Sequence, residues 1–113
     1  MHEMSLCEGI MQILEDNAVK QGYRHVRKVR VEVGQFANVE EDALRFCFDV
    51  VCKNTLADGA SLEILNVPAS TWCMVCCKPV VISERYDPCP DCGSYQLQSD
   101  GGDELRIKDL EVD

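Results

Sequence analysis

Basic residues are scarce in this chain of 113 residues, because eleven lysines and arginines face twenty aspartates and glutamates. The formal net charge is -9, which leaves no basic surface for a nucleic-acid backbone. Many four-cysteine ribbons bind nucleic acid through such a surface. We therefore expect no nucleic-acid partner.

Long apolar runs are also lacking. No apolar segment approaches the roughly 20 residues that a membrane-spanning helix needs, and no basic stretch followed by an apolar run opens the chain. We therefore expect a cytoplasmic protein with no membrane partner. In a reducing cytosol, its eight cysteines are expected to be thiols or metal ligands rather than disulfides.

Sequence patterns for nucleotide binding and catalysis are missing as well. The chain has no G-x-x-x-x-G-K-[ST] loop, so a GTP-driven step would need another protein. No Cys/His pairing and no Ser/His/Asp set is evident, and a thiol redox role conflicts with cysteines tied up in a metal cage. We therefore do not expect an enzyme.

What the chain does contain is two C-x-x-C hooks, Cys73 with Cys76 and Cys89 with Cys92. Two hooks separated by a short loop predict a four-thiolate cage for one tetrahedral metal, usually Zn2+, with iron as the main competitor. Cys77 is a rival for Cys76, but Cys76 completes the same C-x-x-C spacing as the second hook. Few apolar residues surround the hooks, so this module should need its metal to fold.

The remainder alternates between helical and strand patterns. Ser5 with Glu8, and Asn38 with Glu41, resemble capping boxes, which predicts helices from just after residue 5 to Gly22 and over about 39–53. The expected strands include residues 29–33, 61–67 and 105–112. In the last strand the apolar phase slips, which suggests a bulge near Lys108-Asp109.

These elements predict an α+β fold, in which two helices pack on a small three-stranded mixed sheet with an inserted zinc-ribbon or knuckle module. The predicted domains are an α/β domain over 1–67 and 100–113, and a zinc-binding module over 68–99.

The second predicted helix is apolar over most of its circumference. We expect it to be buried between two layers, and the alternative is an exposed stripe that docks a partner. Three further cysteines on the predicted helices are expected to pack as small apolar residues: Cys7, Cys47 and Cys52.

The amino terminus offers a second metal site, since one of the two histidines is residue 2. The amine of Met1, the amide nitrogen of residue 2 and the imidazole of His2 can face one metal, in a geometry that suits Ni(II) or Cu(II). Glu3 could add a carboxylate, an amide nitrogen, or negative charge near the positive end of the helix dipole. Binding would displace protons, so affinity should fall as the pH drops. A histidine at position 2 also fits a frayed terminus without function, and His25 reads as a solvated surface residue.

Several features together resemble the HypA/HybF family of hydrogenase maturation factors: the start Met-His-Glu-Met-Ser-Leu-Cys, Gly34 after a Val-x-Val-x-Val strand, Phe46-Cys47-Phe48-Asp49, and the two hooks. The resemblance implies that His2 binds nickel, that Glu3 supports it or contacts a partner, and that Cys73, Cys76, Cys89 and Cys92 hold structural zinc. It also implies two protein partners, a HypB-type GTPase and the large subunit of a [NiFe]-hydrogenase.

Our interpretation is a nickel metallochaperone, which binds Ni2+ as cargo at its amino terminus and delivers it to the hydrogenase precursor with the partner GTPase. The alternative is a zinc-ribbon protein-interaction adaptor without a nickel role. A homodimer stays open at this point.

Overall fold

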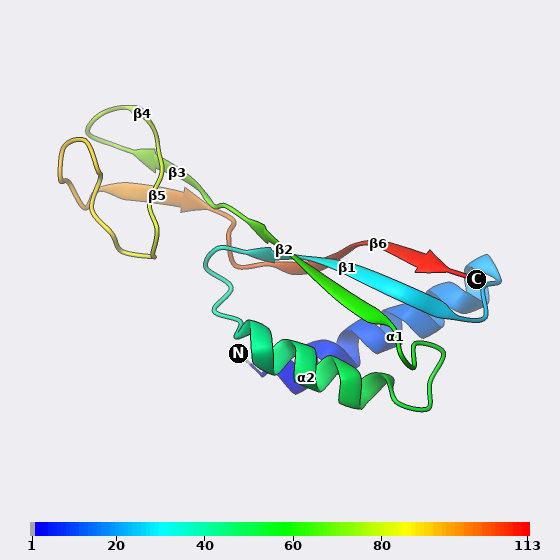
Figure 1. The fold of residues 1–113 in the computed structure, drawn as a ribbon. Coiled ribbons are helices and arrows are strands. Elements are labelled where there is room, and N and C mark those ends of the chain that lie inside the picture. The colour runs from blue at the N-terminus through cyan, green and yellow to red at the C-terminus, as the bar shows by residue number, and fades with distance from the viewer. Residues whose placement is uncertain (1) are drawn as a thin grey trace. The chain divides into compact units, whose positions relative to one another are not determined.

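The computed structural model describes residues 2–113, so the predicted nickel ligand at the amine of Met1 lies outside the described residues. The elements in chain order are α1 (Glu3–Gln21), β1 (Val26–Gly34), α2 (Glu41–Cys52), β2 (Ser61–Val67), β3 (Ser70–Cys73), β4 (Lys78–Val80), β5 (Leu97–Asp100) and β6 (Leu105–Val112), as Figure 1 shows. The strands form two three-stranded sheets, in the orders β2-β1-β6 and β4-β3-β5. No helix among residues 2–113 is both long and apolar enough to cross a bilayer.

The chain divides into two compact units. The first, which we call the helical unit, comprises Met1–Glu32, Val39–Leu65 and Arg106–Asp113, and the second, the cysteine unit, comprises Val33–Asn38 and Asn66–Leu105. Residues 33–38, which end β1 and follow it, group with the cysteine unit. Whether the predicted boundaries at 67/68 and 99/100 separate independently folding domains stays a prediction.

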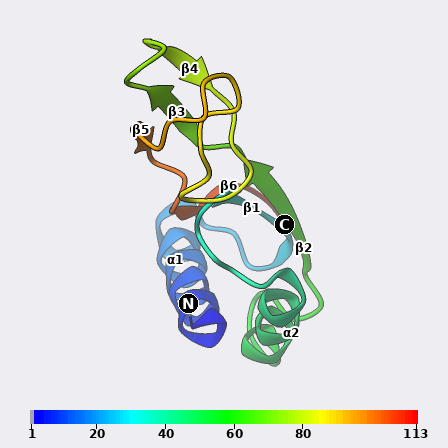
Figure 2. The same cartoon turned by 90° about the vertical axis from the view of Figure 1, so that its left-hand side faces the viewer.

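The sheet that contains β1 is mixed. The Gln35 N–H donates to the Val67 carbonyl where β1 and β2 both end, so these two strands run in the same direction, and β6 runs the opposite way (Figure 1). Helices α1 and α2 pack against each other on one face of this sheet (Figure 2). The predicted α+β class, with two helices on a small mixed sheet, is confirmed.

Alternating valines of β1 supply the sheet side of the core. Val29, Val31 and Val33 are buried, as the half-buried alternating pattern predicts. The helices close the core with Leu14 and Phe48, which are almost fully buried. Cys7 and Cys52 are buried among these residues, which confirms their predicted packing role, whereas Cys47 is only half-buried.

Both helices begin elsewhere than the capping patterns predict. α1 starts at Glu3 with His2 as its N-cap, so Ser5 lies inside the helix and the predicted start was wrong. α2 starts at Glu41 after the N-cap Glu40, and Asn38 lies in the preceding turn with a φ of 56°. Neither N-cap side chain makes a capping hydrogen bond, so the expected sequence signature is missing at both true starts.

The outer side of α2 is not covered. Phe46 is 67% exposed and Val50 is 48% exposed, so the prediction that this helix is buried between two layers was wrong. The reason is that α1 and α2 form a single layer on one face of the sheet, and only the side with Leu44 and Phe48 is enclosed.

In β6, the alternation of backbone groups between the two sides of the strand shifts by one residue, as predicted near Lys108-Asp109. The Glu104 carbonyl accepts from the Gly34 N–H and the Asp113 carbonyl accepts from the Arg24 N–H, at 2.8 and 2.9 Å, so both face the β1 side. In a regular strand, residues an odd number of positions apart face opposite sides. A one-residue slip of the kind a β-bulge produces therefore lies between them.

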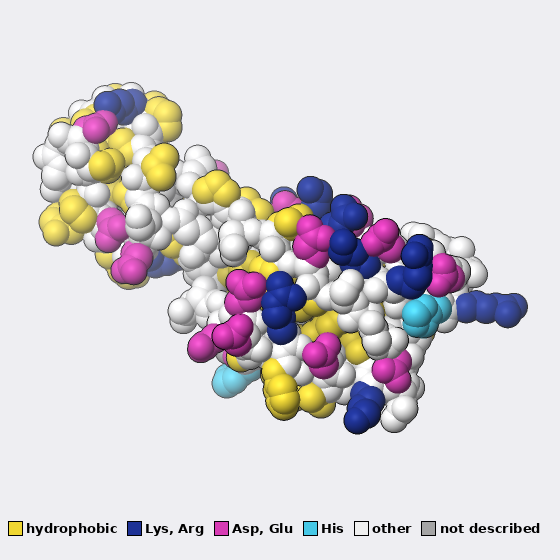
Figure 3. All heavy atoms as spheres, in the orientation of Figure 1, with side chains coloured by type: hydrophobic (Ala, Val, Ile, Leu, Met, Phe, Trp, Pro, Cys, Tyr) yellow, Lys and Arg dark blue, Asp and Glu magenta, His cyan; other side chains and the backbone are white. Residues whose placement is uncertain are grey.

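The side chains of β6 show the same slip. Arg106 pairs with Glu32 and Asp109 pairs with Arg30, at 3.2 and 3.4 Å. Glu32 and Arg30 share one face of β1, so Arg106 and Asp109 lie on that face although they are three residues apart. On this helix-free face, side chains of both charge signs alternate (Figure 3).

Candidate metal sites

The four hook cysteines converge on one point. The sulfur atoms of Cys73, Cys76, Cys89 and Cys92 all lie within 4.8 Å of one another. The Cys73–Cys92 pair is 3.7 Å apart and the Cys76–Cys89 pair is 4.0 Å apart. A zinc tetrahedron with Zn–S bonds of about 2.3 Å has sulfur–sulfur edges of about 3.8 Å. The cluster therefore has the donor set of a closed tetrahedral metal site, and two of its edges have the length that zinc requires.

Both hooks use the same local turn. The Cys77 N–H donates to the Cys73 carbonyl at 2.8 Å, and the Gly93 N–H donates to the Cys89 carbonyl at 2.9 Å. In each hook a backbone N–H also points at the first sulfur, from Cys76 at 3.3 Å and from Asp91 at 3.4 Å. Such N–H groups stabilise a thiolate, because they donate to its negative charge.

This shared turn separates Cys77 from Cys76. The residue after the second cysteine of each hook is left-handed, with a φ of 54° at Cys77 and 74° at Gly93. Cys77 therefore occupies the position that a glycine fills in the other hook, where its exposed thiol is directed to the Met74 carbonyl. Cys76, by contrast, contributes its sulfur to the cluster.

The four cage thiols do not share one environment, because neighbouring thiols raise the pKa of Cys76 to about 12 while that of Cys73 is lowered. The N–H groups of Cys76 and Val75 lower the pKa of the Cys73 thiol to about 7, against the opposing effect of burial. Lys78, on β4, forms an ion pair with Asp91 at 2.5 Å, which ties the first hook to the second. Its ammonium group also lies near the cage sulfurs, where a positive charge offsets part of the charge of four thiolates.

Two cysteines of the helical unit, Cys7 and Cys52, lie apart from the cage and have raised pKa values. Burial raises the pKa of the Cys7 thiol to about 11 and that of the Cys52 thiol to about 12. Among residues 2–113, neither belongs to a group of side chains that could hold a metal ion, so both pack as buried apolar residues.

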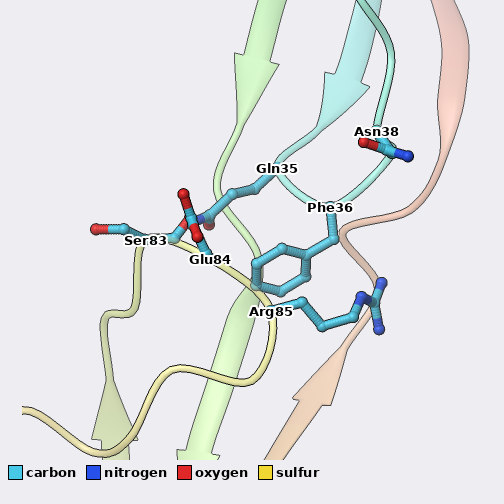
Figure 4. Close-up of a pocket in the computed structure, with 6 residues that line it drawn as sticks. All are labelled: Gln35, Phe36, Asn38, Ser83, Glu84 and Arg85. Atoms are coloured by element: carbon cyan, nitrogen blue, oxygen red, sulfur yellow. The ribbon is translucent and has the colours of Figure 1, made fainter.

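A support of the second hook has no counterpart in the sequence analysis. The side-chain amide of Gln35 donates to the carbonyls of Ile82 and Ser83, at 2.6 and 2.7 Å, and accepts from the Ala69 N–H at 3.0 Å. These contacts hold the segment that leads into Cys89. Figure 4 shows Gln35 beside this segment, with Arg85 lying over the ring of Phe36 at 4.9 Å. No pattern marks Gln35, because its partners are distant backbone groups.

The amino-terminal residues lie at a helix start. His2 is exposed and caps α1, where its carbonyl accepts from the Leu6 N–H at 3.1 Å. The first four N–H groups of a helix have no acceptor within the helix. The amide nitrogens of His2 and Glu3 are therefore not needed for helix formation.

Glu3 connects the starts of the two helices. Its carboxylate accepts from the Glu40 N–H at 3.5 Å, and Glu40 is the N-cap of α2. Two helix N-termini, each carrying partial positive charge, thus lie near this carboxylate. The arrangement favours the charge-balancing role among the three that the sequence allowed for Glu3. The other histidine, His25, lies near Asp113 and the Asp58 carbonyl instead.

Comparisons with known proteins show which family the chain belongs to. Residues 1–112 match the family described as hydrogenase/urease nickel incorporation, metallochaperone, hypA. The hydrogenase maturation factor HypA of Alkalilimnicola ehrlichii is 64% identical over 113 residues, covering 100% of both chains. That of Rhodopseudomonas palustris is 53% identical over 113 residues, again covering 100% of both.

The fold also matches a solved relative. The solution structure of the Ni metallochaperone HypA from Helicobacter pylori superposes with a TM-score of 0.69 at 22% identity, covering 99% of this chain and 97% of that one. At this identity the likeness concerns the fold. The family match over nearly the whole length and the identity to full-length relatives establish that this chain belongs to the HypA family of hydrogenase maturation factors.

Proposed function

We propose that this chain is a nickel metallochaperone, which binds Ni2+ at its amino terminus and delivers it to the large-subunit precursor of a [NiFe]-hydrogenase. Family membership supports the general role, since the family is described as one of nickel incorporation. The observation that carries the site is the position of His2 as the N-cap of α1, where the helix does not use the amide nitrogens of His2 and Glu3.

Transfer requires an open and reversible site. His2 is exposed, and the proposed ligands are its imidazole, adjacent amide nitrogens and the amine of Met1, with Glu3 offsetting the positive helix ends. A cage of four thiolates has no open position, so the cysteine cluster suits a resident zinc ion. Cys73, Cys76, Cys89 and Cys92 would hold that ion, and it would fix the shape of the cysteine unit.

Delivery also involves other proteins in this proposal. The partners are a HypB-type GTPase, which would supply the nucleotide-driven step, and the hydrogenase large subunit, which would receive the nickel. The exposed stripe with Phe46 and Val50 on α2 is a surface to which either protein could dock.

Maturation in cells distinguishes this function from the adaptor alternative. In a strain that lacks its own HypA, we expect the native chain to restore nickel in the hydrogenase large subunit, and the His2→Ala variant to fail. The variant should still bind the partner GTPase and one zinc ion, since neither depends on the imidazole.

The matched control is His25→Ala, which removes the other histidine and should behave as the native chain. If His2→Ala restores hydrogenase nickel as well as the native chain does, the protein acts as an adaptor and the metallochaperone proposal is wrong.

A further inference from the structure

Within the described residues 2–113, strand β6 forms an edge of its sheet that no other strand pairs with. It has β1 on one side only, whereas the opposite edge of the sheet, β2, is engaged by the Arg45 side chain through the Leu62 carbonyl. Because Glu104 and Asp113 both direct their backbone groups toward β1, the residues alternating with them face outward: Leu105 and Ile107 before the slip, and Leu110 and Val112 after it.

The sequence of β6 is complementary to its own reverse. It reads Leu-Arg-Ile-Lys-Asp-Leu-Glu-Val over 105–112. When the strand is laid antiparallel to a second copy with Lys108 opposite Asp109, Arg106 faces Glu111 and Ile107 faces Leu110. A parallel alignment in register would instead set each charge opposite its own kind, which is unfavourable.

The one-residue slip in β6 allows the antiparallel register with Lys108 opposite Asp109. In a dimer with a two-fold axis perpendicular to the sheet, residues that lie opposite each other must point to the same face. In a regular strand, residues 107 and 110 are three positions apart and point to opposite faces, so they could not pair. With the slip, Ile107 and Leu110 both have outward-facing backbone groups, and they could exchange N–H···O bonds across the axis. The four outward-facing residues of β6 pair only with one another in this register.

Exposed apolar surface lies beside the β6 edge, and pairing of two copies would bury it. A hollow of about 470 Å3 lies between α1 and β6, lined by Ile13 and Tyr23 together with Ile107, Leu110 and Val112. Ile13 is 47% exposed, and the three apolar side chains of β6 are half-buried. A neighbouring copy would bring an identical hollow to the same place.

We propose that two copies of this chain pair through β6, joining their three-stranded sheets into one continuous six-stranded sheet. Charges on an edge strand normally deter pairing with other strands. Here they deter every strand except one with the opposite order of charges, and the reversed β6 of a second copy has that order.

Charge reversal on the untagged, zinc-loaded full chain tests the proposal. By sedimentation velocity at physiological salt, the native chain should form dimers as its concentration rises. Glu111→Arg and Arg106→Glu should each raise the dissociation constant at least about tenfold, because each change creates two like-charge pairs across the axis. Asp49→Arg, which changes the charge by the same amount as Glu111→Arg but on the exposed side of α2, should leave dimerisation unaltered.

Mixing the two variants gives the decisive result. In a mixed dimer, the unchanged Arg106 of one chain faces the unchanged Glu111 of the other, and the two substituted side chains face each other with opposite charges. The equimolar mixture should therefore dimerise although neither variant does so alone. The proposal is overturned if the native chain stays monomeric at several hundred micromolar, or if the mixture shows no recovery.

Discussion

Replacing His2 with alanine is expected to weaken Ni(II) binding by more than about 100-fold, because loss of a direct ligand should exceed the 10- to 100-fold cost typical of outer-shell changes. Isothermal titration of the untagged, zinc-loaded protein measures the effect. The zinc content should remain one ion per chain, since the four clustered cysteines lie in a different unit of the fold.

Two further variants show whether the loss of nickel binding is specific to the amino terminus. His25→Ala removes the only other histidine, which contacts Asp113 and Asp58 rather than the chain start, and should leave the titration unchanged. Residues added before Met1 should reduce nickel affinity as strongly as His2→Ala does, since they convert the terminal amine into an amide. An unaltered isotherm in both His2→Ala and the extended chain would remove the amino-terminal site.

Replacing Cys76 with serine is expected to abolish stoichiometric zinc binding and to unfold the cysteine unit. Structural zinc supplies about 10–16 kcal/mol of apparent binding energy in small metal-dependent modules, and little apolar burial is present here to substitute for it. The buried core of this cluster consists of Cys73, Val80 and Cys89.

Trp72 provides a local measurement of this unfolding. It is the only tryptophan in the chain and lies on β3, next to Cys73. Its fluorescence should report early loss of the cysteine unit in Cys76→Ser, while the helical content from α1 and α2 persists in circular dichroism. Chelation of zinc from the native chain should produce the same pair of signals.

Cys77→Gly is the matched control for Cys76→Ser. It should keep one zinc ion and the native fluorescence, and it should raise the melting temperature slightly, because glycine adopts a φ of 54° without the strain of a side chain. Should Cys77→Gly lose zinc while Cys76→Ser retains it, the two cysteines have been assigned the wrong way round.

The features that could be predicted from the sequence are those in which residue types recur at a fixed spacing. The two C-x-x-C hooks indicated the cluster, and the misplaced apolar phase of the last strand indicated the slip in β6. Spacing favoured Cys76 over Cys77, and the structure adds the physical reason: the residue after each hook must be left-handed. The metal that each site binds stays a prediction.

Other features depend on tertiary context and left no local signal. The starts of α1 and α2 were misplaced because neither has a side-chain cap. Periodicity alone could not tell how many layers cover α2, so the exposure of Phe46 was missed. Gln35 was missed because its carbonyl partners lie 47 and 48 residues further along the chain.

Nickel K-edge X-ray absorption of the protein loaded with one nickel and one zinc ion tests the division between the two sites most directly. We expect a first shell of nitrogen and oxygen donors with an imidazole contribution, and a zinc edge that retains four sulfur ligands. Nickel surrounded by sulfur, with zinc displaced from the cysteines, would contradict the account.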